Sequence, residues 1–321
     1  MAFLLSIAVP DIAIISPVNE NHLEQFWTLE RYRSEKLQLL QWAKYIIAYE
    51  GLRQFIDRDA FFYSMGGMSD IDASHMHMTV TGVSADISLK KNMYHIHIPA
   101  FWAYQVENVL PVYGIAEILS LDPNKISECS WEFIPEPGRS ALLQGKWDSV
   151  IIDGSYNGGF ESLCKGIDSV IPFSTTHRIL CFLWDMRELG SHSEKIHTEL
   201  AHYILEHVDT HHDIQFFLVW PMMQKYIFPI LCQKFQTEQS LSSLVLWKKI
   251  EKMLREKKDR KTIVYVKGSQ NTIFLEEWIK EFLANKKDEV LLCRQSKDWL
   301  QKKAKFFSEL WPTDKEKEWL V

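Results

Sequence analysis

Residues Trp147–Ser162 read W-D-S-V-I-I-D-G-S-Y-N-G-G-F-E-S, and this stretch decides the fold class. The short apolar run Val150–Ile152 stops at Asp153-Gly154, and two more glycines follow before Phe160. From Phe160 onward, apolar residues recur at three- and four-residue spacing, which predicts a helix. A buried strand that breaks at a glycine-rich turn into a helix is a common nucleotide site in α/β proteins. We therefore expect backbone N–H groups at the helix start to face a ligand.

The chain beyond this stretch alternates between apolar runs and helical patterns. Runs of strand length occupy Val150–Ile152, Ile179–Leu183, Phe216–Trp220, Leu244–Leu246 and Ile263–Val266. Helical spacing covers Glu194–Val208 and about 271–284, and an aromatic-rich amphipathic tail follows Lys287. This alternation predicts an α/β fold with a mainly parallel sheet covered on both faces and right-handed crossovers.

The N-terminal part has strand-like and helical stretches of its own. Ile12–Ile15 is a strand-length run, the spacing over 28–50 favours a helix, 53–99 is β-like, and 103–121 reads as a helix. The segment Phe133–Arg139, F-I-P-E-P-G-R, is rich in chain-breaking residues. We therefore expect one domain over 1–138 and another, with a helical tail, over 139–321.

Composition restricts the class of protein. The net charge of −6 in 321 residues argues against a nucleic-acid binder. Five cysteines without a C-x-x-C pair fit a reducing compartment and no zinc site. The apolar N-terminus lacks the basic start of a signal peptide, and the run 214–223 is too short to span a membrane. These observations predict a cytoplasmic protein.

Two H-x-H pairs, His75/His77 and His95/His97, lie on predicted strands. Residues two apart on a strand share a face, so a metal site is geometrically allowed. Because no acid or cysteine follows at a matching spacing, we expect none there.

Four stretches, in the same order along the chain, resemble the peptidoglycan Mur ligases of the type that adds D-alanyl-D-alanine to UDP-N-acetylmuramoyl-tripeptide. The similar stretches are P-D-I-A-I-I with H-L-E at 10–15 and 22–24, I-D-G-S-Y-N at 152–157, D-M-R-E-L-G with His197 at 185–190, and V-K-G-S at 266–269. The resemblance implies a partial Mur-ligase central domain followed by a Rossmann-like C-terminal domain.

The resemblance also implies an ATP-dependent amide ligase that works through an acyl phosphate. In this family His22 would bind Mg²⁺, and Lys36, fourteen residues later, would carry a carbamate. Carbamylation turns a cation into an anionic oxygen ligand, which a hard divalent ion prefers. Mg²⁺ would then bridge the ATP phosphates and the acyl phosphate.

By the same comparison, other residues contact the nucleotide or the substrates. Asn108 and Arg139 would lie near ATP, and Asp153, Tyr156 and Asn157 would line the nucleotide crevice. The residues expected to meet the muramoyl peptide and the incoming dipeptide are Asp185, Glu188, Lys267 and Ser269. For each of these the alternative is a structural role, such as a helix cap, a turn residue or a surface lysine.

The sequence also departs from the family. It contains no G-x-x-x-x-G-K-[ST] phosphate loop and no UDP-binding N-terminal domain, and Gly154 stands where the family has a second acid. Two interpretations stay open. The first is a ligase whose phosphate-binding half lies in a missing or separately encoded segment, so that this chain is inactive alone. The second is a degenerate, non-catalytic relative that binds a nucleotide or a partner.

Overall fold

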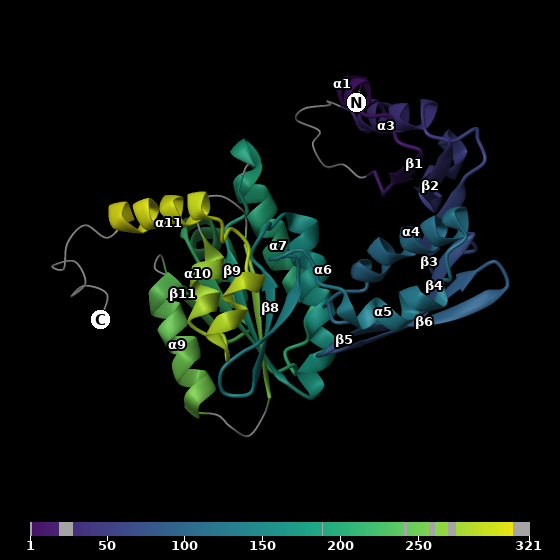
Figure 1. Cartoon of the computed structure of the whole chain (residues 1–321). Coiled ribbons are helices and arrows are strands. Elements are labelled where there is room, and N and C mark those ends of the chain that lie inside the picture. The colour runs from purple at the N-terminus through teal and green to yellow at the C-terminus, as the bar shows by residue number, and fades with distance from the viewer. Residues whose placement is uncertain are drawn as a thin grey trace. The chain divides into compact units, whose positions relative to one another are not determined.

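The computed structural model describes residues 2–18, 28–187, 189–240, 243–256, 261–268 and 274–310. The chain divides into two compact units, Met1–Phe133 and Ile134–Val321. Each unit contains one six-stranded sheet (Figure 1). The division falls at the start of the Pro-rich segment Phe133–Arg139.

Unit 1 carries a sheet of strand order β1-β2-β3-β4-β5-β6. The first four strands are parallel, and β5 and β6 continue the sheet as antiparallel hairpins. The strands are β1 (Ile12–Ile15), β2 (Tyr45–Tyr49), β3 (Phe61–Met65), β4 (Ile71–Thr79), β5 (Gly82–Leu89) and β6 (Asn92–Ile98). The helices and short turns are α1 (Ala2–Ile7), α3 (Leu29–Leu37), η1 (Gln38–Gln41), η2 (Glu50–Phe55), α4 (Tyr104–Leu119), α5 (Asn124–Cys129) and η3 (Ser130–Glu132).

Helix α4 covers the sheet of unit 1, packing against β2, β3, β4 and β5. At Gly114 the helix comes so close to the sheet that a Cβ atom would lie 2.9 Å from Cδ1 of Ile47. The strand expected at Ile12–Ile15, the β-like region and the helix after residue 103 are confirmed.

The helix predicted over 28–50 is wrong in its second half, where the chain forms strand β2. Its central residues Ile46, Ile47 and Ala48 are all buried, because β2 lies between β1 and β3 with both faces covered. A continuous apolar run of this kind is typical of a parallel strand, and its spacing also matches a helical template.

Unit 2 carries a sheet of strand order β11-β10-β9-β12-β8-β7, parallel except for β7. The strands are β7 (Ala141–Gln144), β8 (Ser149–Gly154), β9 (Arg178–Trp184), β10 (Ile214–Val219), β11 (Thr237–Ser240) and β12 (Thr262–Lys267). The helices and short turns are α6 (Phe160–Val170), η4 (Ile171–Thr175), η5 (Gly190–His192), α7 (Ser193–His207), η6 (Met223–Ile227), α8 (Phe228–Leu231), α9 (Ser243–Glu256), α10 (Leu275–Lys280), η7 (Lys286–Leu291) and α11 (Lys297–Leu310).

Helices cover both faces of this sheet. Figure 1 shows α6 and α7 on one side and α9, α10 and α11 on the other. On the second side, Leu246, Trp247 and Ile250 of α9 pack against Phe182 and Phe217 of the sheet. The mainly parallel α/β architecture predicted from the sequence is confirmed.

Four of the five predicted strands of this unit are present as β8, β9, β10 and β12. The strand predicted at Leu244–Leu246 is wrong, because these residues belong to α9. The buried residues Leu246, Ile250 and Leu254 recur every four positions, so the helical period extends beyond the short apolar run. The edge strands β7 and β11 were not predicted, and β11 has the polar sequence T-E-Q-S.

None of the helices in the described ranges combines the length and apolar character needed to span a bilayer.

Candidate functional site

The turn between β8 and α6 lies at the carboxyl end of β8, beside the carboxyl end of β12. Gly154 is in register with Lys267. A Cβ atom on Gly154 would lie 2.7 Å from Cδ of Lys267 and 2.9 Å from the carbonyl oxygen of Val266. Any side chain at 154 therefore requires both Lys267 and the β12 backbone to shift. Glycine here is a packing requirement, and it takes the place of the family's second acid.

Asp153 holds the start of the turn from inside the protein. Its side chain is fully buried, and Oδ1 accepts a hydrogen bond from the Ser155 N–H at 2.9 Å. Burial raises the pKa of Asp153. Burial also lowers the pKa of Lys267 to about 8, although the nearby Asp153 carboxyl opposes this shift. Asp153 thus anchors the turn and does not present a carboxylate to solvent.

Arg139 and Tyr156 form the solvent-facing part of the turn. The antiparallel pairing of β7 with β8 brings residue 141 opposite Asp153, so the segment before β7 lies along the turn. The Tyr156 N–H donates to the carbonyl of Gly138 at 3.1 Å, and Gly138 has φ of +75°. The guanidinium carbon of Arg139 lies 4.5 Å from the centre of the Tyr156 ring. An exposed guanidinium on an aromatic face can contact both a planar base and an anionic group.

Two backbone donors at the start of α6 are already bonded within the chain. The Gly158 N–H donates to Oδ1 of Asn157 at 2.8 Å, and the Gly159 N–H donates to Oγ of Ser162 at 3.1 Å. Glu161 adds a negative charge to the first turn of the helix. We expected N–H groups here to face a ligand, but these two are satisfied by neighbouring side chains. Asn157 is exposed and caps the turn.

The D-M-R segment after β9 is fixed by two buried side chains. Oδ1 and Oδ2 of Asp185 accept hydrogen bonds from the N–H groups of Met223 and Met222, at 2.8 and 3.2 Å. His197 of α7 is fully buried; its Nδ1 donates to the Ser193 carbonyl at 2.7 Å, and its Nε2 accepts from the Met186 N–H at 3.0 Å. Asp185 and His197 therefore position this segment.

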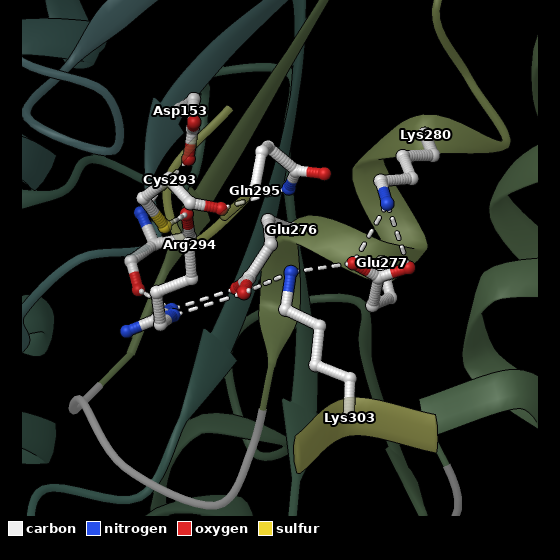
Figure 2. A network of polar contacts seen from close by, with 9 residues as sticks. Asp153, Glu276, Glu277, Lys280, Cys293, Arg294, Gln295 and Lys303 are labelled. Atoms are coloured by element: carbon white, nitrogen blue, oxygen red, sulfur yellow. Dashed lines mark hydrogen bonds and ion pairs between the residues drawn. The ribbon is translucent and has the colours of Figure 1, made fainter. Parts of the chain in front are cut away.

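Glu276 is the centre of a buried ionic network that the sequence analysis missed. Arg294 donates to its two carboxylate oxygens at 2.9 and 2.7 Å, and Lys303 lies 2.8 Å from Oε1. Figure 2 shows the Glu276 carboxylate between these two cations, with Lys303 also reaching Glu277. Burial alone raises the pKa of Glu276, but hydrogen bonds and charges from Arg294 and Lys303 outweigh it and lower that pKa.

The network reaches the candidate site through Arg294, whose Nη2 also donates to the carbonyl of Ser155 at 3.1 Å. The turn after β8, helix α10 and helix α11 are thereby joined at one carboxylate. No motif signals these residues. The aromatic-rich tail predicted only that a C-terminal helix would pack on unit 2, which the contacts of Lys303 bear out.

The remaining predicted site residues lie in unit 1 or outside the described residues. Lys36 is exposed on α3, with Nζ 5.5 Å from the centre of the Tyr32 ring. Asn108 is exposed on α4, and its Nδ2 donates to Oε1 of Gln105 at 3.1 Å. The residues outside the described ranges are His22, Glu188 and Ser269.

The histidines of β4 and β6 meet an acid that the sequence analysis missed. Nδ1 of His75 and Nδ1 of His95 lie 3.1 and 2.9 Å from the carboxylate of Asp86, on the strand between them. Asp86 is close in space because β5 separates β4 from β6, and no sequence spacing reveals this. Across the ranges that the structure describes, no group of three His, Cys, Asp or Glu side chains could hold a metal ion.

The buried His197 makes unit 2 sensitive to acid. Burial lowers its pKa below the ordinary 6.5, so its stabilising contribution is complete above pH 6.5 and is lost as the pH falls below that value. We expect the free energy of unfolding of unit 2 to fall over this range in the wild type and to fall less in His197→Gln, which does not titrate. Urea unfolding at several pH values measures both.

His197→Ala measures how much the hydrogen bond between the Met186 N–H and His197 stabilises unit 2. The change leaves the Met186 N–H without its acceptor, so it should lower the free energy of unfolding by about 1–3 kcal/mol at neutral pH. Burial raises the pKa of Asp185, so its protonation favours the folded form and acts in the opposite sense. Asp185 is present in both the wild type and His197→Gln, so comparing the two proteins at each pH reduces the effect of its titration on the result. Equal pH profiles for the two proteins contradict the assignment.

Comparison with known proteins finds similar sequences and structures. Residues 2–116 match the family model of the Mur ligase middle domain. The UDP-N-acetylmuramoyl-tripeptide–D-alanyl-D-alanine ligase of Haemophilus influenzae is 26% identical over 213 residues, covering 61% of this chain and 44% of that protein. The enzyme of the same name from Rickettsia prowazekii is 24% identical over 216 residues, covering 63% and 48%.

Solved structures show the same fold. A MurF ligase from Thermotoga maritima in complex with ADP has a TM-score of 0.69 and 21% identity, covering 90% of this chain and 64% of that one. MurF from Acinetobacter baumannii has a TM-score of 0.68 and 14% identity, covering 86% and 60%. The chain spans about half the length of the curated relatives it matches.

The family match covers unit 1, while the curated and structural relatives, which are of the MurF type, extend over most of the chain. Residues 2–116 thus match the Mur ligase middle domain, and most of the chain is similar in fold to MurF ligases.

Proposed function

We propose that this chain supplies part of the central domain and the whole C-terminal domain of an ATP-dependent amide ligase of cell-wall synthesis. Its reaction would join D-alanyl-D-alanine to UDP-N-acetylmuramoyl-tripeptide in the cytoplasm. The observation that carries the proposal is the match to curated ligases of that name over 61% of the chain. The ordered motifs at the carboxyl ends of β8, β9 and β12 support it.

The chemistry requires an activated acid, because a carboxylate does not react with an amine at neutral pH. A carboxylate oxygen attacks the γ-phosphorus of ATP and ADP leaves, which gives an acyl phosphate. The amine of the dipeptide then attacks the carbonyl carbon, phosphate leaves, and the amide forms with loss of a proton. The protein's task is to position the reactants and offset the developing charge.

Arg139 and Tyr156 are our candidates for nucleotide contact, because their stacked pair is the solvent-facing part of the turn after β8. Asn157 is exposed on the same turn, and the resemblance makes the exposed Asn108 a further candidate. Asp153 would act indirectly, by anchoring the turn through Ser155.

Lys267, Ser269 and Glu188 are our candidates for the substrate side of the site, with Lys267 itself buried at 5% exposure. Lys267 keeps a largely positive amine at pH 7, because its pKa is about 8, and it ends β12 at the same edge of the sheet. Asp185 would position the segment that leads to Glu188, since its carboxylate is bonded to the N–H groups of Met222 and Met223.

The described residues do not form a complete binding site for magnesium and the ATP phosphates. The exposed ammonium of Lys36 is a cation and ligates a metal only after carbamylation, which would pair it with His22. The Gly158 and Gly159 N–H groups are bonded internally, and the sequence has no phosphate loop. We therefore expect the phosphate-binding half to come from a separate or preceding segment.

A second candidate, a non-catalytic relative that binds a nucleotide or a partner protein, is favoured by one specific feature. Gly154 replaces an acid of the family motif, and the packing of Lys267 and Val266 leaves little room to restore it. The two candidates differ in whether this chain can support ligation once the missing half is supplied.

The isolated chain should form no amide product from UDP-N-acetylmuramoyl-tripeptide, D-alanyl-D-alanine, ATP and Mg²⁺, as measured by mass spectrometry and phosphate release. Fusing the N-terminal part of the Haemophilus influenzae ligase ahead of residue 2 should restore ligation. Product from the unfused chain would overturn the dependence on a missing half. A folded fusion that binds ATP and forms no product would support the non-catalytic relative.

In that fusion, Lys36→Ala should lower kcat by on the order of 100-fold, because it removes a ligand of the charge-neutralising metal. Lys44→Ala is the matched control, since Lys44 is also exposed and its Nζ lies 5.1 Å from the centre of the Tyr45 ring. Labelling with ¹³C-bicarbonate should give a carbamate signal in ¹³C NMR that only Lys36→Ala removes. Equal activity of both variants would refute the role of Lys36.

A further inference from the structure

Arg178 is a buried cation whose terminal nitrogens have no partner among the described residues. It is the first residue of β9, and its side chain is only 1% exposed. Within the described part of the chain, neither Nη1 nor Nη2 has a hydrogen-bond partner. Arginine does not lose its proton in proteins, so the charge persists and an unpaired buried guanidinium is costly. An anion from outside would relieve this cost.

Arg178 is one of the residues that line a cavity of about 340 Å³ between α9 and the sheet of unit 2. The cavity is lined by Arg178, Gln215, Phe217, Gln236, Glu238, Lys249, Lys252, Met253 and Glu256. A volume of this size is within the usual range for small-molecule sites. Because β9 and β10 are parallel and Arg178 and Gln215 lie at their amino ends, the cavity is at the edge opposite the candidate ligase site.

The other charged residues of the lining occur as pairs. Nζ of Lys249 lies 2.6 Å from Oε2 of Glu238, and Nζ of Lys252 lies 3.8 Å from Oε1 of Glu256. These pairs balance each other, which leaves the charge of Arg178 as the net charge of the cavity. A ligand with one negative charge matches it.

The other residues of the lining indicate which chemical groups the ligand would carry. The planar guanidinium presents donors in the geometry of a carboxylate, and Phe217 and Met253 provide an apolar wall. We propose that this cavity binds a small organic carboxylate, with its carboxylate on Arg178 and its apolar part against Phe217 and Met253. Such a site is separate from the ligation chemistry.

Sodium benzoate is a suitable probe, and neutral benzamide of the same shape is its control. At about 100 times its Kd, benzoate should raise the Tm of the full chain by roughly 5 °C relative to sodium chloride of equal ionic strength, and benzamide should not. Arg178→Met should bind benzoate at least about tenfold more weakly by calorimetry. Its Tm without ligand should equal or exceed that of the wild type, because an unpaired buried charge is removed.

Further variants separate binding from folding. Met253→Trp should fill the cavity and abolish the response while Arg178 remains, which tests the site even if Arg178→Met fails to fold. Arg255→Met, an exposed arginine on the same helix outside the cavity lining, should respond like the wild type. Asp259→Asn, which removes the acid close in sequence to Thr262, should also respond like the wild type.

Several results would overturn the proposal. These are an unchanged Tm with benzoate, an equal response to benzamide, or a response retained by Arg178→Met or Met253→Trp. Stabilisation by inorganic phosphate but not by benzoate would replace the carboxylate with a phosphate ligand. A lower Tm of ligand-free Arg178→Met together with a larger benzoate response in Asp259→Asn than in the wild type would assign the guanidinium a partner within the chain.

Discussion

The carboxylate of Glu276 is the single group on which the arrangement of unit 2 most depends. It is fully buried, and it is bonded to Arg294 and Lys303, which are themselves 7% and 3% exposed. Burying three charges is unfavourable unless their geometry is good and their hydrogen bonds are made. Here the bidentate contact with Arg294 and the ammonium of Lys303 meet that condition. The network joins residues far apart in sequence, from the turn after β8 to the last described helix.

The motif residues of the candidate site fall into two groups. Some are buried and hold the backbone, and others are exposed and could contact a ligand. Asp153, Asp185 and His197 belong to the stretches that resemble the Mur ligases, yet each is buried and holds backbone N–H groups. Arg139, Tyr156 and Asn157 face outward from the framework that these residues create. In this chain, most residues of the motifs therefore hold the ends of the strands in position. A smaller number of side chains are available to a ligand.

Much of the fold could be predicted because local pattern and tertiary structure agree. The run Val150–Ile152, the glycines after it and the helix from Phe160 are all found, since a buried parallel strand and an amphipathic helix have distinct periods. Prediction failed at Tyr45–Tyr49 and Leu244–Leu246, where short apolar runs fit both periods and only packing decides between them.

The charged features were not predictable for a different reason. The partners of Glu276 lie 18 and 27 residues away in sequence, Asp86 meets two histidines only through strand order, and Arg178 became notable only through what it lacks. None of these has a characteristic spacing. These contacts form only in the folded chain, whereas the helical and strand periods can be read from the local sequence.

The most direct measurement compares Glu276→Gln with its neighbour Glu277→Gln in the full chain. Urea unfolding of unit 2, with hydrogen exchange at the turn after β8 and in α11, reports on the network. Glu276→Gln should cost about 3–5 kcal/mol and speed exchange in both segments, because the buried Arg294 loses its carboxylate partner and Lys303 loses one of its two. Glu277→Gln, at a partly exposed position, should cost less than about 1 kcal/mol. Equal, small effects of the two changes would contradict the view that Glu276 holds the site together.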